Sequence, residues 1–89
     1  MTTFKLYGNL EPLIDNIPAI ELEAETIRVA VDELTKRFPT LVGELVHDDG
    51  EYNRYYSVLV NGEMMEFLDD LDTALKTDDE VTFFPPIAA

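Results

Sequence analysis

The residues best placed to do chemistry lie at the end of this 89-residue chain. The apolar run 81–84 passes into a short uncharged tail of prolines and small or apolar residues: Pro85, Pro86, Ile87, Ala88 and Ala89. Proline fixes φ at about −65° and drives the residue before it toward extended backbone, so a thin, stiff projection is expected. A carboxylate at the tip of such a tail suits insertion into a channel of another protein.

The other residue types that commonly do chemistry form no such group. His47 is the only histidine and the chain has no cysteine, so a solvated loop residue is expected rather than a metal ligand or a base. The acidic runs 69–72 and 78–80 do not fit a calcium loop, because the fifth position counted from Asp70 is Ala74. Solvated turns are expected there. No glycine-rich phosphate loop or serine–histidine arrangement is visible, so the sequence indicates neither a catalytic nor a metal site.

Two strands and a helix are predicted in the first half of the chain. Apolar and polar residues alternate over 3–10 and over 19–24, which is typical of strands, and the short connection between them predicts a hairpin. A helix is predicted from Thr26, a favourable N-cap, to Pro39, which ends it. The apolar face of this helix consists of Ile27, Ala30, Val31, Leu34 and Phe38.

Three further strands are predicted in the second half. Residues 55–60 are β-branched and aromatic, and Asn61–Gly62 then gives a strong hairpin signal before a short strand at 63–67. A turn or short helical segment at 68–76 precedes the last strand, 80–84. The order β-β-α-β-β-β predicts an α+β domain in which one main helix covers one face of a small mixed sheet.

Composition limits the possible partners. Nineteen acidic and six basic residues give a net charge of −13, so neither nucleic acid nor an anionic membrane is expected to bind. Two explanations of the acidity stay open: a basic surface on a partner enzyme, or solubility in a host with high internal salt. No apolar run is long enough to span a membrane, and no leader peptide or cysteine is present, so a cytoplasmic protein is expected.

Three segments carry a resemblance to a known family. They are VLVNGE at 58–63, LDTALKTDDEV at 71–81 and FFPPIA at 83–88. These segments resemble the ubiquitin-like β-grasp sulfur carriers, which include the small subunit of molybdopterin synthase, the thiamine sulfur carrier and the small archaeal modifier proteins. The resemblance covers nearly the whole chain, and it implies a β-grasp domain over 1–84 followed by an extended tail over 85–89.

The resemblance implies a carrier or modifier rather than an enzyme. An adenylating enzyme of the ubiquitin-activating type is expected to join AMP, from ATP, to the C-terminal carboxylate, while the chain itself holds no cofactor. The product is expected to become a thiocarboxylate that works with a synthase large subunit, or to react with lysines of target proteins. The acceptor of sulfur stays open between molybdopterin, tRNA, thiamine and an amino acid. The Phe-Phe-Pro-Pro string favours the molybdopterin branch or the modifiers.

The tail departs from the family pattern at its last two residues. The family ends in two glycines, which lack a Cβ and can pass a narrow channel, whereas this sequence has Ala88 and Ala89 at the expected attachment or thiocarboxylate position. Three explanations stay open: an engineered block, a natural paralogue, or residues beyond Ala89. The alternative function is a non-covalent interaction subunit that neither conjugates nor transfers sulfur.

Strand alternation predicts a docking surface beside the tail. If the side chains of Phe4, Val58 and Phe83 point at the helix, those of the opposite parity form the outer face of the sheet. Large apolar residues on that face of an acidic protein are expected to mark a partner site. The predicted partner-binding residues are Tyr7, Leu59, Phe84, Pro85, Pro86 and Ile87.

Overall fold

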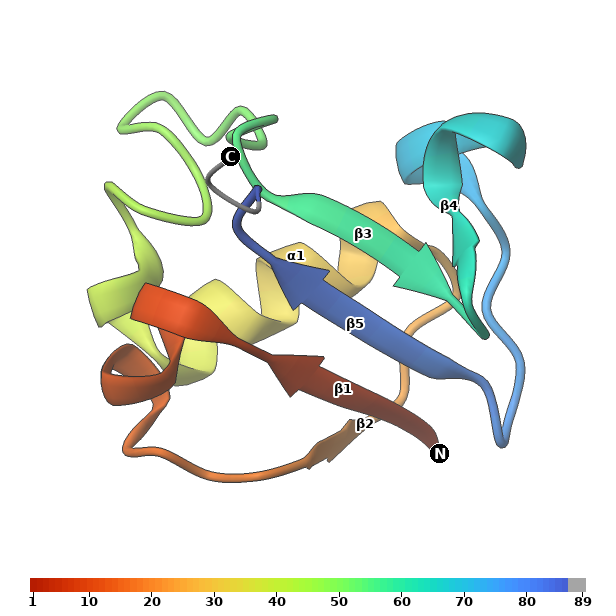
Figure 1. Cartoon of the computed structure of the whole chain (residues 1–89), viewed down its shortest axis with the longest axis horizontal. Coiled ribbons are helices and arrows are strands. Elements are labelled where there is room, and N and C mark those ends of the chain that lie inside the picture. The colour runs from red at the N-terminus through yellow and green to blue at the C-terminus, as the bar shows by residue number, and fades with distance from the viewer. Residues whose placement is uncertain (87–89) are drawn as a thin grey trace.

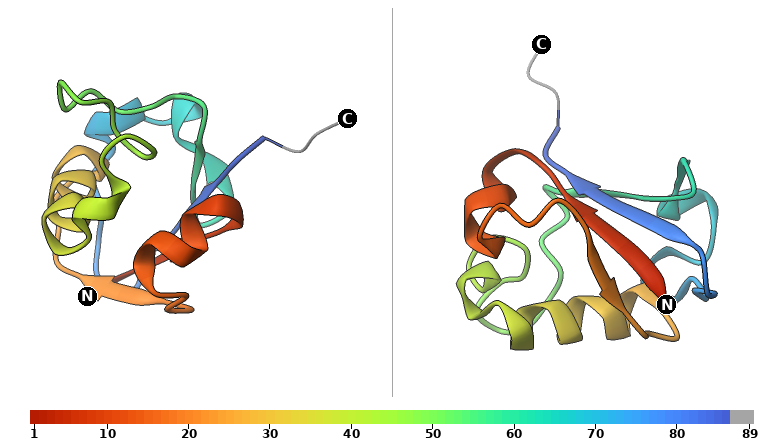
Figure 2. Two further views of the ribbon diagram at one scale, coloured as in Figure 1. Left: turned by 90° about the vertical axis from the view of Figure 1, so that its left-hand side faces the viewer. Right: turned by 90° about the horizontal axis from the view of Figure 1, so that it is seen from below.

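A five-stranded sheet packs against one α-helix in the computed structural model, which describes residues 1–86. Figure 1 shows the two layers, and Figure 2 shows the helix on one side of the sheet. The elements are β1 (Thr2–Leu6), β2 (Ile20–Leu22), α1 (Ile27–Arg37), β3 (Ser57–Val60), β4 (Glu63–Met64) and β5 (Glu80–Phe84). The sheet order is β2-β1-β5-β3-β4, in which β1 and β5 run parallel and the other neighbours antiparallel. The predicted mixed sheet with one main helix is therefore confirmed.

The hydrophobic core lies between α1 and the inner face of the sheet. The residues that alternation places inside are all buried: Phe4, Leu6, Val58, Val60, Val81 and Phe83. The rings of Phe4 and Phe83 stack with their centroids 6.4 Å apart, and the helix contributes Ile27 and Leu34, both fully buried. The central strand β5 thus carries the most buried aromatic contact, so the position at which β5 ends is firmly anchored.

Local signals place the ends of α1 as predicted. The Thr26 hydroxyl accepts a hydrogen bond from the Val29 N–H at 3.2 Å, which satisfies one of the free donors of the first turn. The helix ends at Arg37, two residues before Pro39. The predicted Asn61–Gly62 hairpin is also confirmed, because both residues take positive φ, 52° and 85°, as a type I′ turn requires.

Two predicted strands are wrong in their second halves. The strand predicted over 3–10 ends at Leu6, and a 3₁₀ helix follows from Gly8 to Ile14. Gly8 turns the chain with a φ of +68°, and the Glu11 carboxylate accepts its N–H at 3.0 Å. The strand predicted over 63–67 ends at Met64, because the chain turns into a 3₁₀ helix at Met65–Phe67 that buries Met65. Alternation alone does not distinguish a strand from such a turn.

The segment between α1 and β3 is a long connection with little regular structure. It begins with a 3₁₀ turn at Pro39–Leu41 and continues through isolated bridges and turns to β3. Leu45, Tyr52 and Tyr56 anchor it to the core. Within residues 1–86, no helix has the length and apolar character needed to span a membrane.

Candidate functional site

The chain leaves the sheet at the end of β5, between β1 and β3. Phe84 pairs with Ser57 of β3, and on the other side the Tyr7 N–H donates to the Phe83 carbonyl at 2.9 Å, which extends the ladder one residue beyond β1. Figure 2 shows the last coloured part of the chain, residues 85–86, leaving the end of β5 and pointing away from the sheet. Pro85 is half-buried and Pro86 is exposed, so the exit of the tail is held on both sides up to Pro85.

Pro85 packs directly against Gly8. A Cβ placed on Gly8 would lie 2.6 Å from Pro85 Cγ and 2.9 Å from Cδ, which is closer than real carbon atoms approach. The glycine therefore provides the space that the proline ring occupies. Sequence reasoning missed this contact, although a glycine at the end of a strand is a known sign of a close backbone approach.

Two of the predicted docking residues lie on the face of the sheet where strand alternation places them. Leu59 and Phe84 are half-buried and have the parity opposite to the core residues of their strands. Tyr7 follows β1 and its side chain is 45% exposed. Leu59 pairs with Thr82, two residues before Phe84, so both belong to the outer face of the sheet. Their binding of a partner stays a prediction, and Ile87, Ala88 and Ala89 lie outside the described residues.

The outer face also contains Met64 and Lys5, of which strand alternation in the sequence places only Lys5 there. Met64 pairs with Leu59 and extends the apolar surface onto β4. Lys5 forms an ion pair with Glu80 at 3.1 Å, and the hydrogen bond to Glu80 raises the pKa of the lysine. The face thus combines an apolar part over β3 and β4 with a charged part over β1 and the start of β5. Register, which sequence alternation does not supply, brings these side chains together.

A hydrogen-bonded group crosses beneath the exit of the tail. The Asn9 side-chain amide donates to the Tyr56 hydroxyl at 2.8 Å, and that hydroxyl donates to Glu44 Oε2 at 2.8 Å. Burial, followed by the bond to Glu44, raises the pKa of Tyr56. Asn9 follows β1 and Tyr56 precedes β3, so the group joins the two strands that flank β5. Residues 47 positions apart meet here, and no local sequence signal indicates it.

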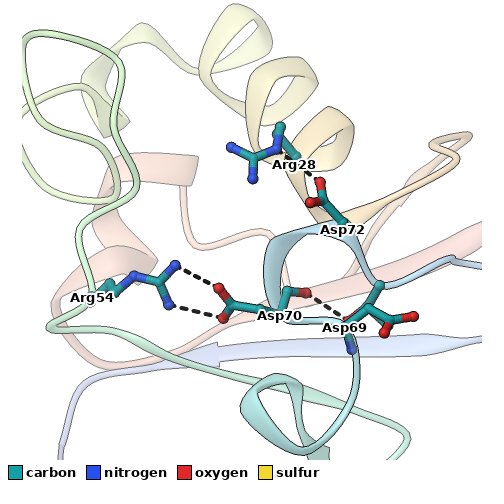
Figure 3. Close-up of polar contacts among 6 residues, drawn as sticks. Arg28, Arg54, Asp69, Asp70 and Asp72 are labelled. Carbon is teal, nitrogen blue, oxygen red and sulfur yellow. Dashed lines mark hydrogen bonds and ion pairs between the residues drawn. The ribbon is translucent and has the colours of Figure 1, made fainter.

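The acidic runs are exposed at most positions, but Asp70 and Asp79 are half-buried, Glu80 belongs to β5, and several of the carboxylates are paired. Figure 3 shows Arg54 bound to both carboxylate oxygens of Asp70, at 2.9 and 2.6 Å, and Arg28 bound to Asp72 at 3.1 Å. The Arg54 guanidinium holds the pKa of the Asp70 carboxyl below its usual value. These pairs tie the connection before β3 and the helix α1 to one 3₁₀ turn, Asp70–Asp72. Their role is therefore structural.

Metal binding finds no support in the described part of the chain. No three histidine, cysteine or acidic side chains within residues 1–86 are arranged to hold a metal ion. His47 is exposed in the loop after the short segment that buries Leu45 and Val46.

Known proteins identify the group to which the chain belongs. The ThiS family matches over residues 5–88. Small archaeal modifier protein 3 of Haloferax volcanii is 36% identical over 63 residues, which are 71% of this chain and 67% of that protein. A putative sulfur carrier protein of Archaeoglobus fulgidus is 26% identical over 72 residues, which are 76% of this chain and 82% of that protein.

A solved structure agrees with these sequence matches. Small archaeal modifier protein 1 from Methanosarcina acetivorans superposes with a TM-score of 0.88 at 26% identity, and the match covers 99% of this chain and 94% of that one. The resemblance to this family is therefore confirmed. The chain belongs to the ThiS family, within the ubiquitin-like β-grasp sulfur carriers and small archaeal modifiers.

Proposed function

We propose that the chain is a sulfur carrier or protein modifier that an adenylating enzyme activates at the C-terminal carboxylate, which is that of Ala89 in this sequence. The enzyme binds ATP, transfers AMP to the carboxylate and releases pyrophosphate. A sulfur nucleophile then displaces AMP to form a thiocarboxylate, or a lysine amine displaces it to form an isopeptide. Because the reaction consumes ATP, we propose that the protein acts in the cytoplasm.

The observation that carries this proposal is the geometry at the end of β5. The last strand is the centre of the sheet, and its end is fixed by pairing with β3 up to Phe84 and with β1 up to Phe83. The half-buried Pro85 and the exposed Pro86 then lead away from the domain. A segment of this kind loses little conformational entropy when it enters a channel, because proline restricts the free chain as well.

The outer face of the sheet supports docking of the partner beside the tail. Leu59, Met64 and Phe84 provide apolar area on a protein of net charge −13. A partner with an apolar patch in a basic surround would bury these side chains and be attracted by the acidic field. An adenylating enzyme and, after activation, a synthase large subunit or a protein lysine are the partners that this chemistry requires.

The alanine pair supports a second candidate. If Ala88 and Ala89 block entry to the adenylation site, the chain would bind the same partner without reacting. Both candidates use the same docking face, so they differ only in whether the carboxylate reacts.

Pyrophosphate exchange distinguishes the two. The chain and its Ala88→Gly/Ala89→Gly variant are assayed with the adenylating enzyme of the same organism, and the variant carrying a C-terminal amide is the control without a free carboxylate. We expect pyrophosphate exchange with the glycine variant. For the chain with the alanine pair, kcat/KM should be lower by roughly 10- to 100-fold. The amide should support no exchange. Exchange at background for the glycine variant, with binding retained, would reject the carrier proposal and leave the interaction subunit.

Mass spectrometry then tests the fate of the activated carboxylate. Replacement of oxygen by sulfur adds about 16 Da, as does oxidation of one methionine, so the sample is first treated with methionine sulfoxide reductases. A gain that survives this treatment supports sulfur transfer. Branched peptides that join the tail to lysines of other proteins support modification.

A further inference from the structure

We propose that Gly8 is a positioning residue that sets the direction in which the tail leaves β5. The contact between Gly8 and Pro85 is a property of the fold, while its consequence for reactivity rests on the proposed function of the tail. The residue does not touch the reacting carboxylate. It acts through the proline ring that begins the tail.

The contact leaves no space for any other residue at position 8. Pro85 Cγ and Cδ lie 2.6 and 2.9 Å from the place of a Cβ on Gly8. These atoms belong to a closed ring that is bonded to the backbone, so they cannot rotate away as the end of a flexible side chain does. A methyl group on residue 8 would therefore move the backbone at Pro85, and the stiff proline pair would carry the change of direction into the residues that follow.

Gly8 is itself held in place from two sides. Its N–H donates to Glu11 Oε2 at 3.0 Å, and the preceding Tyr7 N–H is bonded to the Phe83 carbonyl. The following residue, Asn9, is bonded to the buried Tyr56 that precedes β3. We call Gly8, Asn9 and Tyr56 the tail bracket. It connects the strands on both sides of β5 at the point where the chain leaves the sheet.

Direction matters because adenylation requires the carboxylate to meet the nucleotide phosphate in a defined geometry. A misplacement of about 1 Å can lower the rate of such a step by about 100-fold. Docking should change little, since Leu59 and Met64 of the outer face lie on β3 and β4 rather than beside Gly8. A substitution that disturbs the tail bracket should therefore lower kcat and leave KM nearly unchanged.

Gly50 provides a matched control for the substitution. Gly8→Ala introduces both a Cβ at positive φ and a collision with Pro85. Gly50 has a φ of +89° and no atom within 4 Å of the place of its Cβ, so Gly50→Ala introduces the backbone strain alone. Pro85→Ala provides the complementary test, because it removes Cγ and Cδ and leaves only Cβ, 3.9 Å away.

The first measurement does not depend on the function. Residual dipolar couplings of the Pro85 Cα–Hα bond, recorded by NMR with those of the sheet as reference, report the direction of the tail at its base. We expect Gly8→Ala to change this coupling, Gly50→Ala to leave it unchanged, and the effect of Gly8→Ala to vanish in the Pro85→Ala background. An unchanged Pro85 coupling in Gly8→Ala, with a folded spectrum, overturns the positioning role.

The second measurement is pyrophosphate exchange in the Ala88→Gly/Ala89→Gly background. We expect Gly8→Ala to lower kcat about 10-fold or more with KM within about twofold, and Gly50→Ala to change neither. Equal kcat values for the two alanine variants would overturn the role in reactivity. If no variant supports exchange, the proposed function fails, and the dipolar couplings still decide whether Gly8 directs the tail.

Discussion

Replacement of Tyr56 by phenylalanine tests whether the tail bracket stabilises the domain. The ring is 1% exposed, and Tyr56→Phe retains it, so no cavity larger than one oxygen atom results. The substitution removes the bonds from Asn9 and to Glu44, both 2.8 Å long. Asn9 is exposed and Glu44 half-buried, so both can bind water afterwards, and the penalty for an unpaired buried group does not arise.

The expected loss follows from the two bonds. A neutral hydrogen bond contributes about 1 kcal/mol to the free energy of unfolding, and one to a charged group about 1.5 kcal/mol or more. We therefore expect Tyr56→Phe to destabilise the domain by roughly 2–3 kcal/mol, which for a chain of this size lowers Tm by roughly 10–20 °C. Urea unfolding monitored by circular dichroism measures this loss of free energy, provided that the m value is the same in both proteins.

Tyr55 supplies the matched control, because it is 58% exposed and its ring meets that of Tyr56 edge-on at 5.1 Å. Tyr55→Phe should change the free energy of unfolding by less than about 0.5 kcal/mol. In a Glu44→Ala background, the effect of Tyr56→Phe should shrink by about 1.5 kcal/mol, which is the coupling of the pair. A loss below about 0.5 kcal/mol for Tyr56→Phe would refute the reasoning, since the hydroxyl would then be bonded equally well to water.

Alkaline pH provides a second check on the same side chain. The pKa of Tyr56 is raised in the folded protein, so the stabilisation linked to its proton is present below the ordinary tyrosine pKa of about 10 and is lost as pH rises above it. The difference in stability between the wild type and Tyr56→Phe should accordingly narrow above about pH 10. If the difference in stability stays constant up to the pH at which the protein unfolds, the assignment of the raised pKa to this hydroxyl is contradicted.

Three further predictions concern stability. Arg54→Gln should return the depressed pKa of Asp70 toward its ordinary value. A carboxyl with a depressed pKa stabilises the fold above about pH 4, and this stabilisation is lost on acidification, so the free energy of unfolding of the variant should fall less steeply as the pH is lowered. An NMR titration that finds the same Asp70 pKa in both proteins would count against this. Thr26→Ala removes the cap bonded to Val29 and should destabilise the domain by about 1 kcal/mol in urea, whereas Thr26→Ser should retain most of the stability. Raising the salt concentration from about 0.1 to 1 M shortens the Debye length from about 10 to 3 Å, so Tm should rise for a chain of net charge −13; a fall in Tm would mean that the ion pairs outweigh the repulsion.

In the proposed function, the reacting tail and the docking face meet at one end of one strand. β5 is the most enclosed strand of the sheet, and its last residues pass from the core at Phe83 through the outer face at Phe84 to the proline pair. Under the proposed function, the same few residues anchor the tail, contribute to the docking surface and begin the projection. A change in any of them is expected to affect more than one of these roles, which is why the proposed tests pair each variant with a control outside this region.

Local physics allowed much of the fold to be predicted from the sequence. Period-two alternation identified the inner and outer residues of β1, β3 and β5, because successive side chains of a strand point to opposite faces. Thr26 and Pro39 marked where α1 begins and where it must have ended, and Asn61–Gly62 marked the hairpin. Each of these residues acts on the backbone of its own neighbours. The family resemblance followed from three short strings, each contiguous in the sequence.

Contacts between distant parts of the chain needed the tertiary structure. The turn of β1 into a 3₁₀ helix at Gly8 keeps the alternation of a strand while changing its backbone, so the pattern extended the strand too far. The order and register of the strands decide which distant residues meet. They bring about the hydrogen bond of Asn9 to Tyr56, the ion pair of Arg54 with Asp70 and the contact of Gly8 with Pro85. The sequence by itself determined which side chains of β1, β3 and β5 face the core and which face the outer side of the sheet. Only the folded chain decided what holds that tail at its base, because side chains far apart in sequence become neighbours only when the sheet is assembled.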